Sequence, residues 1–266
     1  MTDTKKMPDV ALESATYALP LQWVGMKNIE LPIQLTTQAG ALTVPAKVRA
    51  QVSLDQSPSR GIHMSRLFLE VQKLSEKPLT AENLQLAVAQ FLETHKDLSS
   101  KAVLEIEFEL PLKRKALKSD NSAWRTYPVK LSAQNEWGVI STFCEVQITY
   151  SSTCPASAAL ARQLIQENFL ENYRGDLSID AVSSWLSSQQ GINATPHAQR
   201  SVGRVKAEFA GELPIENLIE LTEEALQTPV QGAVKRVDEQ EFALRNGQNL
   251  MFCEDAARRV GQALEN

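Results

Sequence analysis

The stretch LPIQLTTQ at residues 31–38 recurs later in the chain as YPVKLSAQ at residues 127–134. The two copies share a proline, a leucine and a glutamine at a constant offset of 96 residues, and the match continues without a gap through residues 46–54 and 143–150. In these later segments apolar and polar residues alternate, which is the period of strands with one buried face. The repeat therefore predicts two related β-hairpins, one in each half of the chain.

A second series of matches follows at an offset of 134 residues. An H-x-x-R motif occurs at residues 63–66 and again at 197–200, and the tripeptide ENL occurs at residues 82–84 and 216–218. Because the matches keep the same order, each half is expected to contain a hairpin, an H-x-x-R segment and an amphipathic helix that begins near ENL. The larger offset means that the second half carries an insertion near residues 151–191.

Helix and strand signals agree with this organisation. Thr80 is a favourable N-cap for a helix over residues 81–95, and Pro214 suits the first turn of the equivalent helix in the second half. In the first half a strand follows over residues 102–110, with its glutamates on the exposed face. The second half ends instead with the helical segment CEDAARRVGQALEN. We therefore expect that its closing strand is missing from this sequence or is supplied by another chain.

The predicted fold class is α+β, with antiparallel sheets and helices packed on one face. We expect an N-terminal extension over residues 1–21, a first module over 22–120 and a second module, which carries the insertion, over 121–266. Within the insertion, the apolar residues of 160–169 are spaced like a helix face, and SIDAVSSWLSSQ is expected to form a second short helix.

The composition excludes several classes of function. A hydrophobic content of 43% and a charged content of 22% are those of a soluble globular protein. The net charge of −5 provides no basic field for nucleic acid or for a membrane surface. No apolar run approaches the roughly 18 residues of a membrane span, and the first residues lack the apolar core of a secretory signal. The three cysteines are therefore expected to be reduced, in a cytoplasmic protein.

The cysteine in STCPASAAL, residues 151–159, is the first candidate for chemistry. Cys154 follows a strand and precedes Pro155, which suits the first turn of a helix. A thiol at a helix N-terminus can have a lowered pKa, so Cys154 could be a reactive thiolate or a metal ligand, or simply a packed side chain between two elements. Cys144 lies on the apolar face of its strand and is expected in the core, and Cys253 is expected to be a packing residue.

The three histidines differ in their surroundings. His95 lies at the end of a predicted helix beside Lys96, so a surface or helix-capping role is expected. His63 and His197 occupy equivalent places in the repeat, which favours a structural role for the pair. Only His197, however, lies in the same half of the chain as Cys154.

Two carboxylates differ from the many that must be solvated. Glu239 lies near the cations Lys235 and Arg236, and Glu254 opens a helix, where its charge is favourable whatever its function. Cysteine, histidine and glutamate side chains can together bind a borderline divalent metal, although their wide spacing here is not a compact metal motif. The sequence contains no P-loop, GxGxxG, HExxH or GxSxG motif, so a phosphate-rich substrate would be held by side chains. The candidates are Arg66, Arg200, Lys235 and Arg236.

Five blocks of the sequence point to a family when they are taken together. They are RGIHMSRL (60–67), SSTCPASAAL (151–160), TPHAQRSV (195–202), VKRVDEQ (234–240) and MFCEDAARRV (251–260). In this order they resemble the blocks of the type IB GTP cyclohydrolases, and the resemblance runs from about residue 22 to the end. It implies tandem tunnelling-fold modules in a bimodular subunit, and a homotetramer with its active sites at subunit interfaces.

The resemblance also implies a reaction and its residues. Enzymes of this family convert GTP and water to 7,8-dihydroneopterin triphosphate and formate, a step toward folate and queuosine precursors. A divalent metal (Mn, Zn or Fe) acidifies the water that attacks C8 of the purine. Cys154 matches the family's metal-binding cysteine, His197 the histidine of its H-x-Q-R-S block and Glu239 the acidic residue of its K-R-x-D-E block. The resemblance thus implies these three as metal ligands, and Cys154 and His197 as the catalytic residues.

Substrate contacts follow from the same resemblance. Glu254 resembles the glutamate that accepts two hydrogen bonds from the guanine N1–H and 2-amino groups. The other residues expected to bind substrate are His63, Arg66, Arg200, Lys235 and Arg236.

The sequence departs from the family in two places. Family members often read C-P-C, whereas Ala156 stands at the second cysteine, so only the first is expected to be essential. An E-S-x-H-P-H block that supplies a further glutamate ligand is absent, which we interpret as a truncated sequence. Two rival functions stay open: a nitrile-reducing queuosine enzyme of the same fold that forms a covalent thioimide on cysteine, and a non-catalytic purine or pterin binder.

Overall fold

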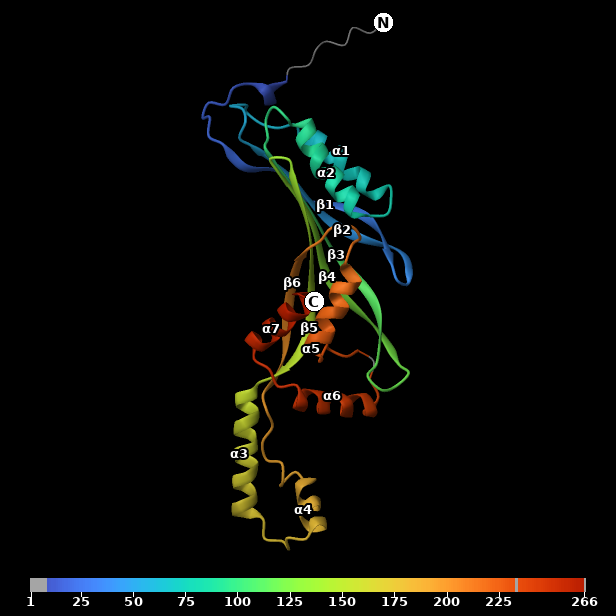
Figure 1. Ribbon diagram of the computed structural model, residues 1–266, viewed down its shortest axis with the longest axis vertical. Helices are drawn as coiled ribbons and strands as arrows, with labels where there is room; N and C mark the ends of the chain where they lie inside the picture. The colour runs from blue at the N-terminus through green and yellow to red at the C-terminus, as the bar shows by residue number, and fades with distance from the viewer. Residues whose placement is uncertain (1–8, 233, 266) are drawn as a thin grey trace. The chain divides into compact units, whose positions relative to one another are not determined.

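The computed structural model describes residues 9–232 and 234–265. Six strands form one sheet in sequence order, and the pairs β1–β2, β2–β3 and β4–β5 are antiparallel (Figure 1). The strands are β1 (Leu21–Thr37), β2 (Gly40–Leu54), β3 (Lys101–Lys115), β4 (Ser122–Glu136), β5 (Val139–Thr153) and β6 (Ala198–Glu208). The helices are α1 (Met64–Gln72), α2 (Ala81–Thr94), α3 (Pro155–Asn172), α4 (Ile179–Leu186), α5 (Ile215–Leu226), α6 (Arg236–Gln248) and α7 (Cys253–Glu265), with short 3-10 turns η1 (Val10–Leu12) and η2 (Lys73–Ser75). The predicted α+β class is confirmed.

The described residues form two compact units. Unit 1 takes in those of Met1–Leu112, Thr126–Gln147 and Arg204–Leu218. Unit 2 takes in those of Lys113–Arg125, Ile148–Gly203 and Ile219–Asn266. The two modules expected from the repeat are a division by sequence, and they stay a prediction.

Two hairpins in unit 1 contain the repeated stretches. Strand β1 pairs with β2 so that Pro32 lies opposite Pro45, and β4 pairs with β5 so that Leu131 lies opposite Cys144. The turn between β4 and β5 consists of Trp137 and Gly138, whose φ angles are 53° and 88°. Two consecutive residues with positive φ match the right-handed twist of a tight hairpin. The two predicted hairpins are confirmed.

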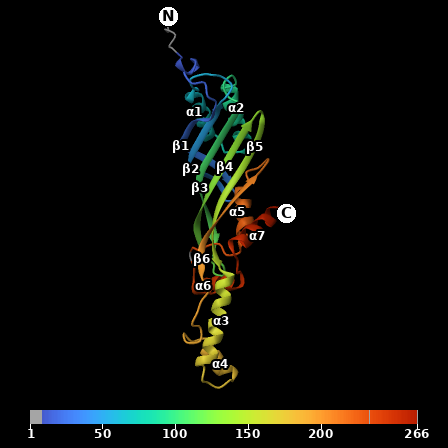
Figure 2. The same ribbon diagram turned by 90° about the vertical axis from the view of Figure 1, so that its left-hand side faces the viewer.

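The core of unit 1 lies between one face of its strands and the helices α1 and α2. Helix α1 contacts β1 and β2 and packs against α2, as Figures 1 and 2 show. On the strands every second residue is buried, as the alternation predicts. The fully buried members include Val48, Ala50, Val52, Leu104 and Ile106. From the helices, Leu67, Val71, Leu84, Val88 and Phe91 complete this apolar layer.

Helix α2 begins as predicted, but the histidine that follows it is buried. The Thr80 hydroxyl accepts a hydrogen bond from the Asn83 amide at 3.2 Å, so Thr80 is the N-cap. His95 is the C-cap residue, which agrees with the expected capping position, yet it is only 1% exposed, so the surface role was wrong. Its Nδ1 lies 2.9 Å from the Phe91 carbonyl oxygen. Burial lowers the pKa of His95.

The two H-x-x-R segments adopt different structures. His63 is the N-cap residue of α1, and its Nε2 lies 3.4 Å from Asp9 Oδ2. His197 directly precedes strand β6. The same motif therefore starts a helix in unit 1 and a strand in unit 2, and its two copies match in sequence only.

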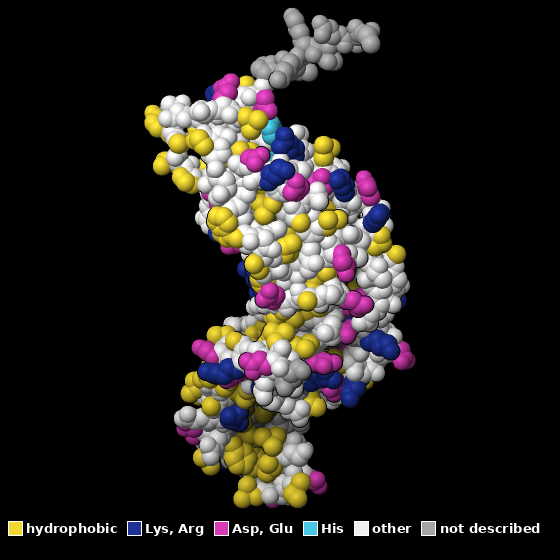
Figure 3. Space-filling model, turned by 45° about the horizontal axis from the view of Figure 1, so that its top comes forward, with side chains coloured by type: hydrophobic (Ala, Val, Ile, Leu, Met, Phe, Trp, Pro, Cys, Tyr) yellow, Lys and Arg dark blue, Asp and Glu magenta, His cyan; other side chains and the backbone are white. Residues whose placement is uncertain are grey.

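The insertion in the second half is helical, as predicted. Phe169 stacks on Tyr173 with ring centroids 5.0 Å apart, and Trp185 meets these two rings edge-on at 5.2 and 5.4 Å. These contacts hold α4 against α3, and the two helices lie side by side in Figure 1. Exposed apolar side chains such as Leu170 and Ile179 surround them, and Figure 3 shows hydrophobic side chains gathered over this segment.

Acidification should destabilise the protein through His95. Because its folded-state pKa lies below 6.5, the unfolded chain binds the proton first as the pH falls, so the stability that neutral His95 provides is lost below about pH 6.5. We expect the thermal midpoint of the wild type to fall more between pH 7 and pH 5 than that of His95→Asn. His63 and His197 are retained in both proteins, so their contributions cancel. Parallel pH profiles for the two proteins would contradict this account.

Candidate functional site

Cys154 stands where β5 ends and α3 begins. It is the N-cap residue of α3, and its Sγ accepts a hydrogen bond from the Ser157 amide at 3.5 Å. Pro155 occupies the first turn of the helix, where its missing N–H leaves nothing unsatisfied. The side chain is half-buried, so the sulfur lies at a helix N-terminus with partial access to solvent.

His197 is held directly beside Cys154 by the backbone. The Cys154 amide donates to the His197 carbonyl oxygen at 3.1 Å. The His197 amide in turn donates to Ser157 Oγ at 2.8 Å. Ser157 therefore binds both residues, through its amide and its hydroxyl. This role of Ser157 was not predicted. Its position three residues after the N-cap is one at which a side chain commonly bonds back to the start of the helix, so the sequence did contain an indication of it.

The start of α7 lies on the other side of the β5 end. Leu250 forms a parallel bridge with Thr153, and the Met251 amide donates to the Thr153 carbonyl oxygen at 3.1 Å. These bonds place Glu254, in the first turn of α7, three residues after a segment that is hydrogen-bonded to β5. Cys154, His197 and the start of α7 are thus brought together within unit 2.

Glu254 is exposed and is ionised readily. Hydrogen bonds from its own backbone N–H and from the Cys253 thiol lower the pKa of the Glu254 carboxyl. The thiol donates to Glu254 Oε2 at 3.2 Å. The same contact raises the pKa of Cys253, which is exposed rather than packed as expected.

The cations expected to contact phosphate lie at the start of α6 and on β6. Lys235 and Arg236 are exposed at the start of α6, and Arg200 is exposed on β6. The predicted ligand Glu239 is also exposed in the first turn of α6. Asp238, which directly precedes Glu239, is fully buried. A hydrogen bond from the Ser119 hydroxyl, with further bonds from backbone amides, holds the pKa of Asp238 well below its usual range.

The structure brings only some of the predicted metal-binding and substrate-binding residues close together. Among residues 9–232 and 234–265, no three histidine, cysteine, aspartate or glutamate side chains come together as a metal site. The set of Cys154, His197 and Glu239 therefore stays a prediction. His63 and Arg66 belong to unit 1, where Arg66 donates to the Thr94 carbonyl oxygen at 2.7 Å. Their binding of substrate also stays a prediction.

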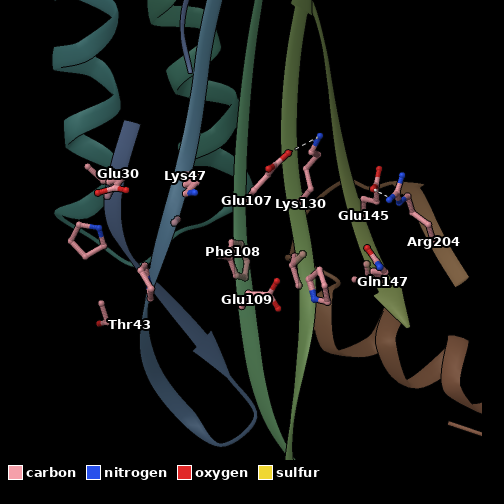
Figure 4. A pocket seen from close by; sticks show the side chains of 17 residues that line it. Glu30, Thr43, Lys47, Glu107, Phe108, Glu109, Lys130, Glu145, Gln147 and Arg204 are labelled. Carbon is pink, nitrogen blue, oxygen red and sulfur yellow. Dashed lines mark ion pairs between the residues drawn. The ribbon is translucent and has the colours of Figure 1, made fainter. Parts of the chain in front are cut away.

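A groove of about 1060 Å³ lies on the polar face of the unit 1 strands (Figure 4). Two of its three basic residues are paired with its own glutamates: Lys130 Nζ lies 2.9 Å from Glu107, and Arg204 Nε lies 3.4 Å from Glu145. The groove also carries Glu30 and further acidic side chains. Because four glutamates face three cations there, it is a poor place for an anionic substrate.

The surface shows no single-sign field on the face drawn in Figure 3, where acidic and basic side chains are interspersed. None of the described helices has the length and apolarity needed to cross a membrane.

Comparison with known structures bears on the fold. The chain is similar to the crystal structure of uricase from Arthrobacter globiformis, with a TM-score of 0.53 and 9% identity, over 94% of this chain and 78% of that one. At so low an identity the likeness supports the fold alone, a mixed α+β arrangement around antiparallel strands.

Comparison with known sequences identifies the family. The type I GTP cyclohydrolase folE2 family matches residues 7–266. Proteins named GTP cyclohydrolase FolE2 are 59% identical in Bdellovibrio bacteriovorus, 50% in Pseudoalteromonas translucida and 46% in Hydrogenovibrio crunogenus. The matches cover 98%, 97% and 98% of this chain and 87%, 88% and 85% of those relatives. The chain therefore belongs to the type I GTP cyclohydrolase folE2 family, which is generally metal-dependent.

The residues at the β5 end fit part of such a metal site. A thiolate and an imidazole are donors that a borderline divalent cation accepts, and the backbone keeps Cys154 and His197 adjacent. A third protein donor is not gathered beside them among the described residues. Cys154 and His197 therefore have the donor chemistry of metal ligands and adjacent backbones, and their binding of a metal stays a prediction.

Two of the three cysteines should react with iodoacetamide in the native protein. These are Cys253, which is exposed, and Cys154, which is half-buried. Cys144 should react only after unfolding, because burial raises its pKa to about 12 and shields the sulfur. A time course near pH 8, followed by peptide mass spectrometry, measures the three rates, and a denatured sample is the control. Native labelling of Cys144 as fast as that of Cys253 would contradict the buried position.

Proposed function

We propose that this GTP cyclohydrolase converts GTP and water to 7,8-dihydroneopterin triphosphate and formate. The observation that carries the proposal is the Cys154–His197 pair at the end of β5, in a chain of the folE2 family. The product would serve folate and queuosine precursor synthesis in the cytoplasm. The nitrile-reductase and non-catalytic alternatives are not favoured, since the relatives carry the cyclohydrolase name over nearly the whole chain.

Cys154 and His197 would hold the catalytic metal, with Glu239 as the third ligand. A divalent cation there (Mn, Zn or Fe) would supply an acidified water for attack on purine C8. Ser157 keeps the two first ligands in place, because its amide binds the Cys154 sulfur and its hydroxyl accepts from the His197 amide.

Glu254 would select guanine. Its carboxylate can accept hydrogen bonds from both the N1–H and the 2-amino group, a pair of donors that adenine does not present. The lowered pKa of Glu254 keeps it in the ionised, acceptor-only form at neutral pH. The Cys253 thiol occupies one lone pair of Oε2 and orients the carboxylate.

The triphosphate would be bound by exposed cations. Lys235 and Arg236 at α6 and Arg200 on β6 belong to unit 2, and His63 and Arg66 belong to unit 1. We propose a type IB enzyme of bimodular tunnelling-fold subunits, with modules over 22–120 and 121–266, assembled as a homotetramer. If each active site is shared between subunits, a second subunit can supply ligands that the described residues of one chain do not bring together.

Loss of the metal or of its cysteine should abolish turnover. The protein is freed of metal by chelation and assayed with GTP, with and without Mn²⁺ or Zn²⁺, by formate release and pterin fluorescence. Activity should return only with metal, and Cys154→Ala should lose about 100-fold or more of it together with bound metal. Cys144→Ala, the same change in the core, should keep both. A Cys154→Ala protein that retained metal and turnover would refute the role of this thiol.

Replacement of the Glu254 carboxylate should reduce guanine selectivity. In Glu254→Gln one acceptor oxygen becomes an NH₂ donor that faces a guanine donor, so KM for GTP should rise by about tenfold or more. Inosine triphosphate, which lacks the 2-amino group, should be a weaker substrate of the wild type. The variant should discriminate less between the two nucleotides. An unchanged GTP-to-inosine triphosphate ratio would remove Glu254 from the guanine site.

A further inference from the structure

Asp238 is a buried carboxylate that binds two segments of unit 2. Its Oδ1 accepts from the amides of Lys118 and Ser119, at 2.8 and 2.9 Å. Its Oδ2 accepts from the Ser119 hydroxyl at 2.6 Å and from the Lys235 amide at 2.8 Å. Four donors thus surround a side chain that has no exposed surface.

These bonds join the β3–β4 connection to the start of α6. Lys118 and Ser119 lie between β3 and β4, whereas Lys235 immediately precedes α6. A second contact reinforces the junction, since Lys118 Nζ lies 3.4 Å from Glu241 Oε2. A buried carboxylate with all of its lone pairs engaged holds its partners in one geometry, because any displacement leaves a charge unpaired.

The side chains on either side of Asp238 are not held by hydrogen bonds of this kind. Within the described part of the chain, Arg236 and Glu239 are exposed and their side chains make no hydrogen bond or ion pair. The direction in which they project is therefore set by the backbone of residues 235–239. That backbone is tied to the rest of unit 2 through Asp238.

We propose that Asp238 is a positioning residue for substrate: it fixes the segment 235–239 so that Lys235 and Arg236 meet the triphosphate chain. The inference rests on the proposed function, in which these two cations bind the phosphates. Asp238 itself touches neither substrate nor metal. Its effect on catalysis passes through the two cations.

A purely structural role for Asp238 is the alternative, and the chain offers a matched control for it. Asp55 in unit 1 is bonded in a similar way, because it accepts from the Ser100 amide at 3.0 Å and from the Ser100 hydroxyl at 2.5 Å. Asp55→Asn should lower thermal stability as Asp238→Asn does, without touching the segment 235–239.

The experiment compares Asp238→Asn, Ser119→Ala and Asp55→Asn in the intact protein. The asparagine amide keeps an acceptor for the Lys118 and Ser119 amides but turns an NH₂ group toward the Lys235 amide. We expect KM for GTP and the Kd for inorganic triphosphate, measured by calorimetry, to rise about tenfold in Asp238→Asn. Ser119→Ala, which removes one of the four donors, should raise both by about threefold. Asp55→Asn should leave both at wild-type values.

Each outcome decides the proposal. Equal binding of triphosphate by Asp238→Asn and the wild type, at whatever loss of thermal midpoint, would make the role structural and overturn it. If Asp238→Asn does not fold, Ser119→Ala is used in its place, and its KM for GTP and Kd for triphosphate are compared with those of the wild type. A wild-type protein that binds triphosphate but does not turn over GTP would refute the proposed function. The triphosphate Kd values of the variants would still test whether Asp238 positions the two cations.

Discussion

The last residues of β5 are hydrogen-bonded to two other segments of the chain, and the candidate site of unit 2 depends on these bonds. The Cys154 amide donates to His197 on one side, and the Thr153 carbonyl accepts from Met251 on the other. Strand β6 begins at the first contact and α7 shortly after the second. Backbone bonds do not depend on side-chain identity, so Cys154, His197 and Glu254 are placed before any ligand binds.

Much of the fold follows from local patterns that the sequence displays directly. Alternation along β2, β3 and β5 predicts which face is buried, because successive strand residues point to opposite sides. The N-caps Thr80 and Cys154 mark where α2 and α3 begin, and both caps are present. These features depend on neighbours a few residues apart, so a single sequence contains enough information to predict them.

Features that depend on distant residues were not predictable in this way. The H-x-x-R motif starts α1 in one place and β6 in another, because pairing with β5 decides the second. His95 is buried by tertiary packing although its neighbour Lys96 is exposed. The bonds from Lys118 and Ser119 to Asp238 span more than a hundred residues and have no local signature. Of the candidate site, the resemblance to the family named Cys154 and His197, whereas neither the backbone bond between them nor the role of Ser157 was predicted.

The charges near α6 explain why position matters in an acidic protein. With a net charge of −5 the chain offers a polyphosphate no long-range attraction, so binding depends on a few cations at short range. Lys235 and Arg236 stand two or three residues from Asp238, whose carboxylate would compete with a phosphate as their partner if it lay exposed beside them. Its oxygens accept instead from donors inside unit 2. These hydrogen bonds stabilise the carboxylate away from the surface, and they also hold the backbone that carries the two cations.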